Sequence, residues 1–187
     1  MNKTKRKIFE ASMKLFAEKG YDATSVEEIT ATVGVAKGTL YYHFASKEEI
    51  YNFLLEEGTK LLINNVDIKI SKLDNAIDKI RAVILLQLRV MIKYEDLITI
   101  YLSSLWGVQT RNKTTQKYLN TYIDKIKEIV EEGIKSGELK NGDSDIIAFE
   151  IFSFTCSGMM YKIKANRDID LKKVCNEFDN LIYGLKK

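Results

Sequence analysis

The stretch from Ser25 to Lys47 constrains the fold of this chain most, because it has the features of two short helices joined by a tight turn. Ser25 and Glu28 have the spacing of a capping box, in which each side chain bonds the other residue's backbone N–H. Apolar residues then recur at helical spacing and define one face: Val26, Ile29 and Val33. Gly34 is expected to end this helix, because glycine adopts the left-handed conformation of a tight turn without steric strain.

A second short helix is predicted from about Lys37 to Phe44, with Ala36, Leu40 and Phe44 on the face that packs inward. The opposite face carries a lysine, a glycine, a threonine and two tyrosines. Such a face suits a DNA groove, where lysine binds phosphate or guanine and hydroxyl groups bind phosphate or base edges. Aromatic rings can contact thymine methyl groups and sugars, and glycine lets the backbone come close. The alternative is a helical core whose surface is simply polar.

The candidate DNA contacts include two residues at the start of the first short helix, where backbone N–H groups favour phosphate. Tyr41 is also a candidate for partial burial, and His43, the only histidine, for a packed or capping role. The full set of predicted DNA-binding residues is Thr24, Ser25, Lys37, Gly38, Thr39, Tyr41, Tyr42, His43 and Lys47.

Over about Thr4 to Ile50 the chain resembles the TetR family of bacterial transcriptional regulators. The most specific part of the resemblance is the run from Val33 to Phe44, followed by Ser46-Lys47-Glu48-Glu49. The resemblance implies a DNA-binding repressor with a separate, ligand-responsive helical domain, and it places His43 as a phosphate contact. It also implies that the helix after the motif transmits ligand-driven motion, and that the last two helices of two subunits form a four-helix dimer interface.

The composition favours a helical protein. The 187 residues include no proline, which breaks helices, and 45% of them are hydrophobic, enough for a sizeable core. Residues 1–47 contain 8 Lys and Arg against 5 Asp and Glu, whereas residues 48–187 contain 21 of each. The whole positive excess therefore lies with the predicted helix-turn-helix, where DNA would need it.

Apolar periodicity and turn residues predict helices along the rest of the chain. They are expected at about residues 4–19, 46–65, 74–94, 96–106, 116–136, 144–164 and 171–185, with a loop at 109–115 and a turn at 141–143. The predicted fold is all-α, with a three-helix DNA-binding domain at residues 1–62, whose motif spans about 24–43, and a larger helical regulatory and dimerisation domain at 63–187.

The helix expected at residues 144–164 is apolar almost all round, so it must be covered on more than one side. We expect one side to face the domain interior and the other to face a partner subunit. A two-fold homodimer formed through the last two helices would match a palindromic operator on double-stranded DNA.

A pocket for a small hydrophobic or amphipathic ligand is expected within residues 65–165. Aromatic and methionine side chains there could line it, although such residues can equally be ordinary core. Arg89 and Glu150 could anchor a polar ligand, pair at a dimer interface or face solvent. The candidate ligand-binding residues are Arg89, Met91, Tyr94, Tyr101, Trp106, Tyr122, Phe152, Met159 and Met160.

No enzymatic constellation is found in the sequence. A single histidine gives little basis for a catalytic or metal cluster, and neither a phosphate-binding loop nor a dinucleotide-binding glycine pattern occurs. Cys156 and Cys175 lack metal-ligand spacing. We therefore predict no catalytic residue, no metal and no cofactor, and a cytoplasmic protein without a signal peptide or membrane span.

The sequence thus predicts a homodimeric DNA-binding regulator, a repressor that a small molecule releases from its operator. Ligand would favour a dimer whose recognition helices no longer fit successive major grooves, about 34–36 Å apart. One alternative is a DNA-binding regulator controlled by a protein partner instead of a small molecule. Another is a helical ligand carrier or enzyme whose helix-turn-helix is incidental.

Overall fold

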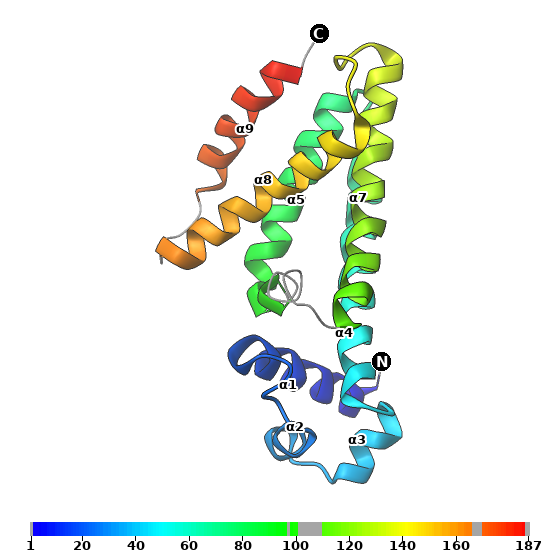
Figure 1. Cartoon of the computed structure of the whole chain (residues 1–187), viewed down its shortest axis with the longest axis vertical. Helices are drawn as coiled ribbons and strands as arrows, with labels where there is room; N and C mark the ends of the chain where they lie inside the picture. Colours follow the sequence, from blue (N-terminus) through cyan, green and yellow to red (C-terminus); the bar gives the residue numbers. More distant parts are fainter. Residues whose placement is uncertain (1, 97, 101–109, 166–169, 186–187) are drawn as a thin grey trace. The chain divides into compact units, whose positions relative to one another are not determined.

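All regular secondary structure in the described part of the chain is α-helical, which confirms the predicted fold class (Figure 1). A computed structural model describes residues 2–96, 98–100, 110–165 and 170–185. The helices in these ranges are α1 (Lys3–Lys19), α2 (Val26–Val33), α3 (Lys37–His43), α4 (Lys47–Ile70), α5 (Ala76–Lys93), α7 (Thr110–Ser136), α8 (Ser144–Ala165) and α9 (Leu171–Leu185).

The chain divides into two compact units. Unit 1 consists of Met1–Thr59 and Tyr94–Tyr118, and unit 2 consists of Lys60–Lys93 and Leu119–Lys187. The division after residue 59 lies close to the boundary expected at residues 62 and 63. Unit 1 also includes residues 94–118, which the sequence analysis assigned to the regulatory domain. Tyr94, Ile100 and Tyr118 belong to unit 1 because they pack against its hydrophobic core.

The core of unit 1 lies where α1, α2 and α3 pack on one another and on the first turns of α4. Tyr51 is buried in this core, and its hydroxyl lies 3.0 Å from the hydroxyl of Thr115 on α7. The fully or almost fully buried apolar residues are Ile8, Phe16, Ile29, Leu40, Phe44, Ile50, Tyr51, Leu54, Leu55 and Ile100. Apolar side chains of α1, α2 and α3 thus meet in one core.

In unit 2, helix α5 packs against both α8 and α9. Its apolar residues recur at helical spacing on the buried side, as Ile80, Ile84 and Leu88 illustrate. Phe154 of α8 packs on Phe178 of α9, with ring centres 5.2 Å apart. Unit 2 is therefore a helical bundle with a largely apolar interior.

Three details of the sequence-based helix assignment differ from the structure. Helix α4 continues to Ile70 instead of ending at residues 64–65, and α7 begins at Thr110, where residues 109–115 were expected to form a loop. Thr115 is fully buried, so tertiary packing outweighs the weak helix propensity of this polar stretch. Ala36, expected to face inward, is exposed at the start of α3. Most of the helix expected at 96–106 lies outside the described residues.

Among the residues that the structure describes, no helix combines the length and the hydropathy needed to cross a lipid bilayer.

Gly133 of α7 is expected to be sterically required. A Cβ atom there would lie 2.6 Å from the Cβ of Ala76 and 2.7 Å from a methyl carbon of Leu139. We predict that Gly133→Ala destabilises the protein by about 1–3 kcal/mol, because overpacking outweighs the gain in helix propensity. Urea unfolding followed by circular dichroism measures the change.

The matched control is Gly158→Ala on α8, where the added Cβ would meet no atom closer than 3.8 Å. This variant should gain about 0.5–1 kcal/mol from helix propensity. Equal effects of the two substitutions would contradict the steric explanation.

Candidate functional site

The first helix of the helix-turn-helix begins with the predicted capping box. The Glu28 N–H donates to Ser25 Oγ at 3.1 Å, and the Ser25 N–H donates to a Glu28 carboxylate oxygen at 2.9 Å. Lys19 of α1 donates to the other Glu28 oxygen at 2.9 Å. The backbone hydrogen bond from Ser25, together with the bonds from Lys19 and the Ser25 hydroxyl, lowers the pKa of Glu28 from 4.5 to about 2. This one carboxylate therefore joins α1 to the start of α2.

The turn between α2 and α3 depends on Gly34, which has a φ of 73° in the left-handed region. Its N–H donates to the Thr30 carbonyl at 2.9 Å, and the Val35 N–H donates to the same carbonyl at 3.1 Å. These bonds close the end of α2 and direct the chain into α3. On α3 the apolar positions Leu40 and Phe44 are buried, as the sequence predicts.

The opposite face of α3 is exposed and carries most of the predicted DNA contacts. Tyr42 is 83% exposed and Tyr41 is 47% exposed. Gly38 has open space where a side chain would project, and the His43 ring packs edge-on against Tyr42 with 5.0 Å between ring centres. Thr39 lies on the flank, partly exposed. Because the Tyr42 ring lies outside the core of unit 1 and is largely exposed, it is available to a binding partner.

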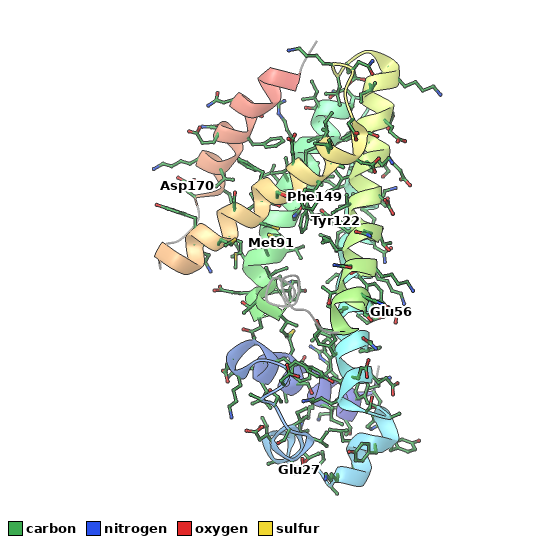
Figure 2. The ribbon with its side chains drawn as sticks, viewed as in Figure 1. Glu27, Glu56, Met91, Tyr122, Phe149 and Asp170 are labelled. Atoms are coloured by element: carbon green, nitrogen blue, oxygen red, sulfur yellow. The ribbon has the colours of Figure 1, made fainter. Side chains whose placement is uncertain are left out.

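Lys37, at the start of this face, forms an ion pair with Glu27 of α2. Glu27 is labelled in Figure 2. The hydrogen bond between the two side chains raises the pKa of Lys37 and lowers that of Glu27. The sequence analysis did not consider Glu27. Because a phosphate or a guanine base would compete with this carboxylate for the Lys37 ammonium, Glu27 also lies within the candidate site.

The side chains of three predicted DNA-binding residues form hydrogen bonds within unit 1. The Thr24 hydroxyl is buried and donates to the Gly20 carbonyl at 2.9 Å, while Ser25 is engaged in the capping box. Lys47 Nζ donates to the carbonyls of Tyr21 and Thr24 at 2.8 and 2.7 Å and lies 4.2 Å from the centre of the Tyr21 ring. These positions favour structural roles, and DNA contacts by these three residues stay predictions.

The predicted ligand-binding residues are distributed differently from the expectation. Within unit 2 the side chains of four of them are buried: Met91, Tyr122, Phe152 and Met159. Tyr94 is partly buried in unit 1, and Tyr101 and Trp106 lie outside the described residues. Arg89, Glu150 and Met160 are exposed on the surface. Of the four buried candidates, Tyr122 of α7 and Phe152 of α8 are in ring contact, with 6.2 Å between ring centres.

A polar residue that the sequence analysis missed lies in this interior. Gln87 of α5 is 1% exposed and accepts a hydrogen bond from the Tyr122 hydroxyl at 3.0 Å. The signal was present in the sequence, because Gln87 is spaced at i+3 from Ile84 and i+7 from Ile80 on the apolar stripe of α5. Burial raises the pKa of the Tyr122 hydroxyl, so this group stays protonated and remains a donor.

Matches to two protein families together cover most of the chain. Residues 8–53 match the family of bacterial regulatory proteins described as the tetR family. Residues 73–159 match the family described as the tetracyclin repressor-like C-terminal domain. The two matches fall in order along the chain.

Among individual relatives, the chain is 30% identical over 137 residues to the fatty acid metabolism regulator protein of Bacillus subtilis, a match that covers 72% of this chain and 70% of that protein. A shorter match, 46% identical over 52 residues and spanning 28% of either chain, is to IcaR, a negative transcriptional regulator of the icaADBC biofilm operon in Staphylococcus epidermidis.

Solved structures show the same fold along nearly the whole chain. A proposed fatty acid metabolism regulator of Clostridium perfringens is 31% identical, with a TM-score of 0.86 and coverage of 92% of this chain and 94% of that one. The regulator FadR of Bacillus subtilis, solved in complex with stearoyl-CoA, is 26% identical, with a TM-score of 0.83 and the same coverage.

The capping carboxylate makes a testable contribution to acid stability. Because folding lowers the pKa of Glu28, its stabilising contribution is complete above pH 4.5 and is lost as the pH falls toward about 2. We predict that Glu28→Gln, which retains the capping geometry but not the charge, unfolds at a lower temperature than wild type at pH 7. The difference should shrink between pH 4.5 and pH 2 in thermal unfolding followed by circular dichroism.

Lys19→Met is the companion variant, because it removes the cation that bonds Glu28. In this background the Glu28→Gln difference should become smaller and disappear at a higher pH. A Glu28→Gln effect that is independent of pH would show that the charge of Glu28 contributes nothing to folding.

Proposed function

The chain belongs to the TetR family of bacterial regulatory proteins, and on that premise we propose that it represses transcription as a homodimer bound to a palindromic operator. A DNA-binding regulator needs an exposed surface that fits a groove, and the outward face of α3 provides it. The observation that carries the proposal is the 83% exposure of Tyr42 on a helix whose opposite face, with Leu40 and Phe44, is buried. Such a helix can enter the major groove without disturbing its own core.

Lys37 is proposed to provide the electrostatic part of DNA binding. In the free protein its ammonium is paired with Glu27, whose carboxylate is largely exposed. A phosphate or a guanine O6 and N7 would replace Glu27 as the partner of the lysine. Because the ion pair with Glu27 already holds the Lys37 side chain in position, DNA binding only exchanges one anionic partner for another.

The second subunit is proposed to cover an exposed apolar face of α8. Four large apolar side chains on this helix are each more than half exposed: Ile146, Phe149, Met160 and Tyr161. They share one side with the small residues Ser153 and Ser157, which permit close helix approach. Figure 2 labels Phe149 on this helix. Large apolar side chains grouped on one helix face mark an interaction surface, and a two-fold dimer would cover that face with its own copy.

The controlling molecule is proposed to be a fatty acyl-coenzyme A. The B. subtilis regulator was solved with stearoyl-CoA, and the relative with 30% identity is named for fatty acid metabolism. The interior of unit 2 in this chain contains Met91, Phe152 and Met159, all buried, which suits a long apolar chain. Ligand would shift the population toward a dimer that no longer fits the operator. We infer a non-enzymatic role in the bacterial cytoplasm, where the chromosome lies.

Selection of bound duplexes from a random DNA pool at two salt concentrations tests the central proposal. A two-fold symmetric site that survives the higher salt, and is released by stearoyl-CoA, is the expected result. Binding that ignores sequence and vanishes with salt would reflect only the phosphate backbone and would refute specific operator recognition.

Substitutions on α3 should weaken operator binding without unfolding the protein. We predict that Tyr42→Ala and Lys37→Ala each reduce affinity for the selected operator by about 1–3 kcal/mol, measured by fluorescence anisotropy. Lys37→Ala should also reduce the salt dependence of binding by about one phosphate contact. Lys72→Ala, which removes an exposed cation from unit 2, is the charge-matched control and should bind normally. Equal losses of operator affinity for Lys37→Ala and Lys72→Ala would show that only the net charge of the protein matters.

A further prediction concerns the exposed apolar face of α8 as the dimer interface. The double variant Phe149→Glu and Met160→Glu should be monomeric in sedimentation velocity, because like charges would be buried across the two-fold axis. Its operator affinity should fall at least about tenfold, because two half-sites would no longer be bound by one linked particle. Ile68→Glu, on a 63% exposed position of α4, is the matched control and should remain dimeric. A dimeric double variant would place the interface elsewhere.

A further inference from the structure

A buried amide in unit 2 has a hydrogen-bonding group without a partner among the described residues. Gln87 is 1% exposed, and its Oε1 accepts from the Tyr122 hydroxyl at 3.0 Å. Its Nε2 is fully buried and donates to no protein atom there. Both N–H groups of this amide nitrogen are therefore unused in the interior of the helical bundle.

The surroundings of this amide are apolar. The Tyr122 ring packs against the Phe152 ring of α8 with 6.2 Å between centres. Burial raises the pKa of the nearby Cys156 thiol to about 12, so this group adds no charge to the region. A buried donor without a partner destabilises the folded state, and a methionine of similar size would avoid this loss. An amide at position 87 is therefore explained poorly by packing.

The Tyr122 hydroxyl determines how the amide is oriented. Because the hydroxyl donates to Oε1, the carboxamide plane is held and Nε2 is directed away from Tyr122. A donor held in an apolar interior complements a ligand that is mostly apolar but carries one acceptor oxygen. Recognition of this kind discriminates strongly, because an analogue without the oxygen leaves the protein donor unpaired.

We propose that the Gln87 amide is the hydrogen-bond donor that recognises the carbonyl oxygen of an acyl thioester bound inside unit 2. This assignment rests on the proposed function and specifies which atom of the ligand the protein reads. The thioester carbonyl is the acceptor that lies next to the apolar chain of an acyl-coenzyme A. Gln87 would thereby distinguish an acyl thioester from other molecules with an equally long apolar chain.

The burial of the amide also has a consequence for regulation. Because Nε2 has almost no exposed area, a ligand reaches it only when α5, α7 or α8 shifts. A hydrogen bond from the amide to the ligand then stabilises the shifted arrangement of these helices and not the arrangement in which the amide is buried. A ligand with this differential affinity shifts the population of the regulator, as release from an operator requires.

The test compares two ligands that differ only at the carbonyl. Stearoyl-CoA has the thioester oxygen, whereas the thioether S-octadecyl-CoA lacks it and retains the apolar chain and the coenzyme. Isothermal titration calorimetry on the full-length protein should show that wild type binds the thioester at least about tenfold more tightly. Gln87→Met should bind both ligands with similar affinity, and in the free state it should unfold at a higher temperature than wild type.

Two further variants keep the test decisive. Gln116→Met makes the same change at an exposed glutamine of α7 and should retain the wild-type preference. Tyr122→Phe releases the amide oxygen and should reduce the thioester preference while thioether binding is retained, which gives a second reading if Gln87→Met does not fold.

The outcomes separate this inference from the proposed function. If Gln87→Met keeps the thioester preference, or weakens both ligands equally, the inference is overturned while control by acyl-coenzyme A stands. If wild type binds neither ligand, the ligand class of the proposed function is overturned together with the inference. A loss of preference confined to Gln87→Met and Tyr122→Phe supports it.

Discussion

The burial of Leu40 and Phe44 is the constraint on which the proposed DNA-binding surface depends. A helix of seven residues does not hold its shape alone, so α3 needs tertiary contacts to persist. Leu40 is fully buried, and the Phe44 ring lies under the ammonium of Lys5, 4.7 Å from the ring centre. Because one face of α3 is held in this way, the direction of Tyr42 on the opposite face is fixed as well.

The same core connects the first helices of unit 1 to segments that follow much later in the chain. Ile100 is buried in it, and the Tyr51 hydroxyl bonds the Thr115 hydroxyl at 3.0 Å. The chain therefore passes between the two units within α4 and again within α7. Under the proposed function, a ligand in unit 2 would act on helices that also belong to the core of unit 1.

Under the proposed function, the interior of unit 2 serves both stability and ligand recognition. Most of its interior is apolar, which stabilises the fold, yet Gln87 and Tyr122 place a polar pair within it. A core selected only for stability would exclude the unsatisfied amide. If the amide binds a ligand, the free energy lost in the empty protein is regained on binding.

Much of this architecture could be predicted from sequence because it depends on neighbouring residues. Helical periodicity, the capping box of Ser25 and Glu28, and the left-handed Gly34 are local features that a few residues encode. The outward face of α3 follows from the same periodicity. By contrast, residues 94–118 belong to the same compact unit as residues 1–59 through long-range packing, which leaves no local pattern in the sequence.

What the sequence determined by itself is the all-α fold, the helix-turn-helix and the side chains that α3 presents, because caps, turns and periodicity act over a few residues. Only the tertiary structure decided that Lys47 bonds the carbonyls of Tyr21 and Thr24, and that Gln87 is buried beside Tyr122. Which polar group ends in the interior depends on how helices from distant parts of the chain pack, and helical spacing alone does not contain that information.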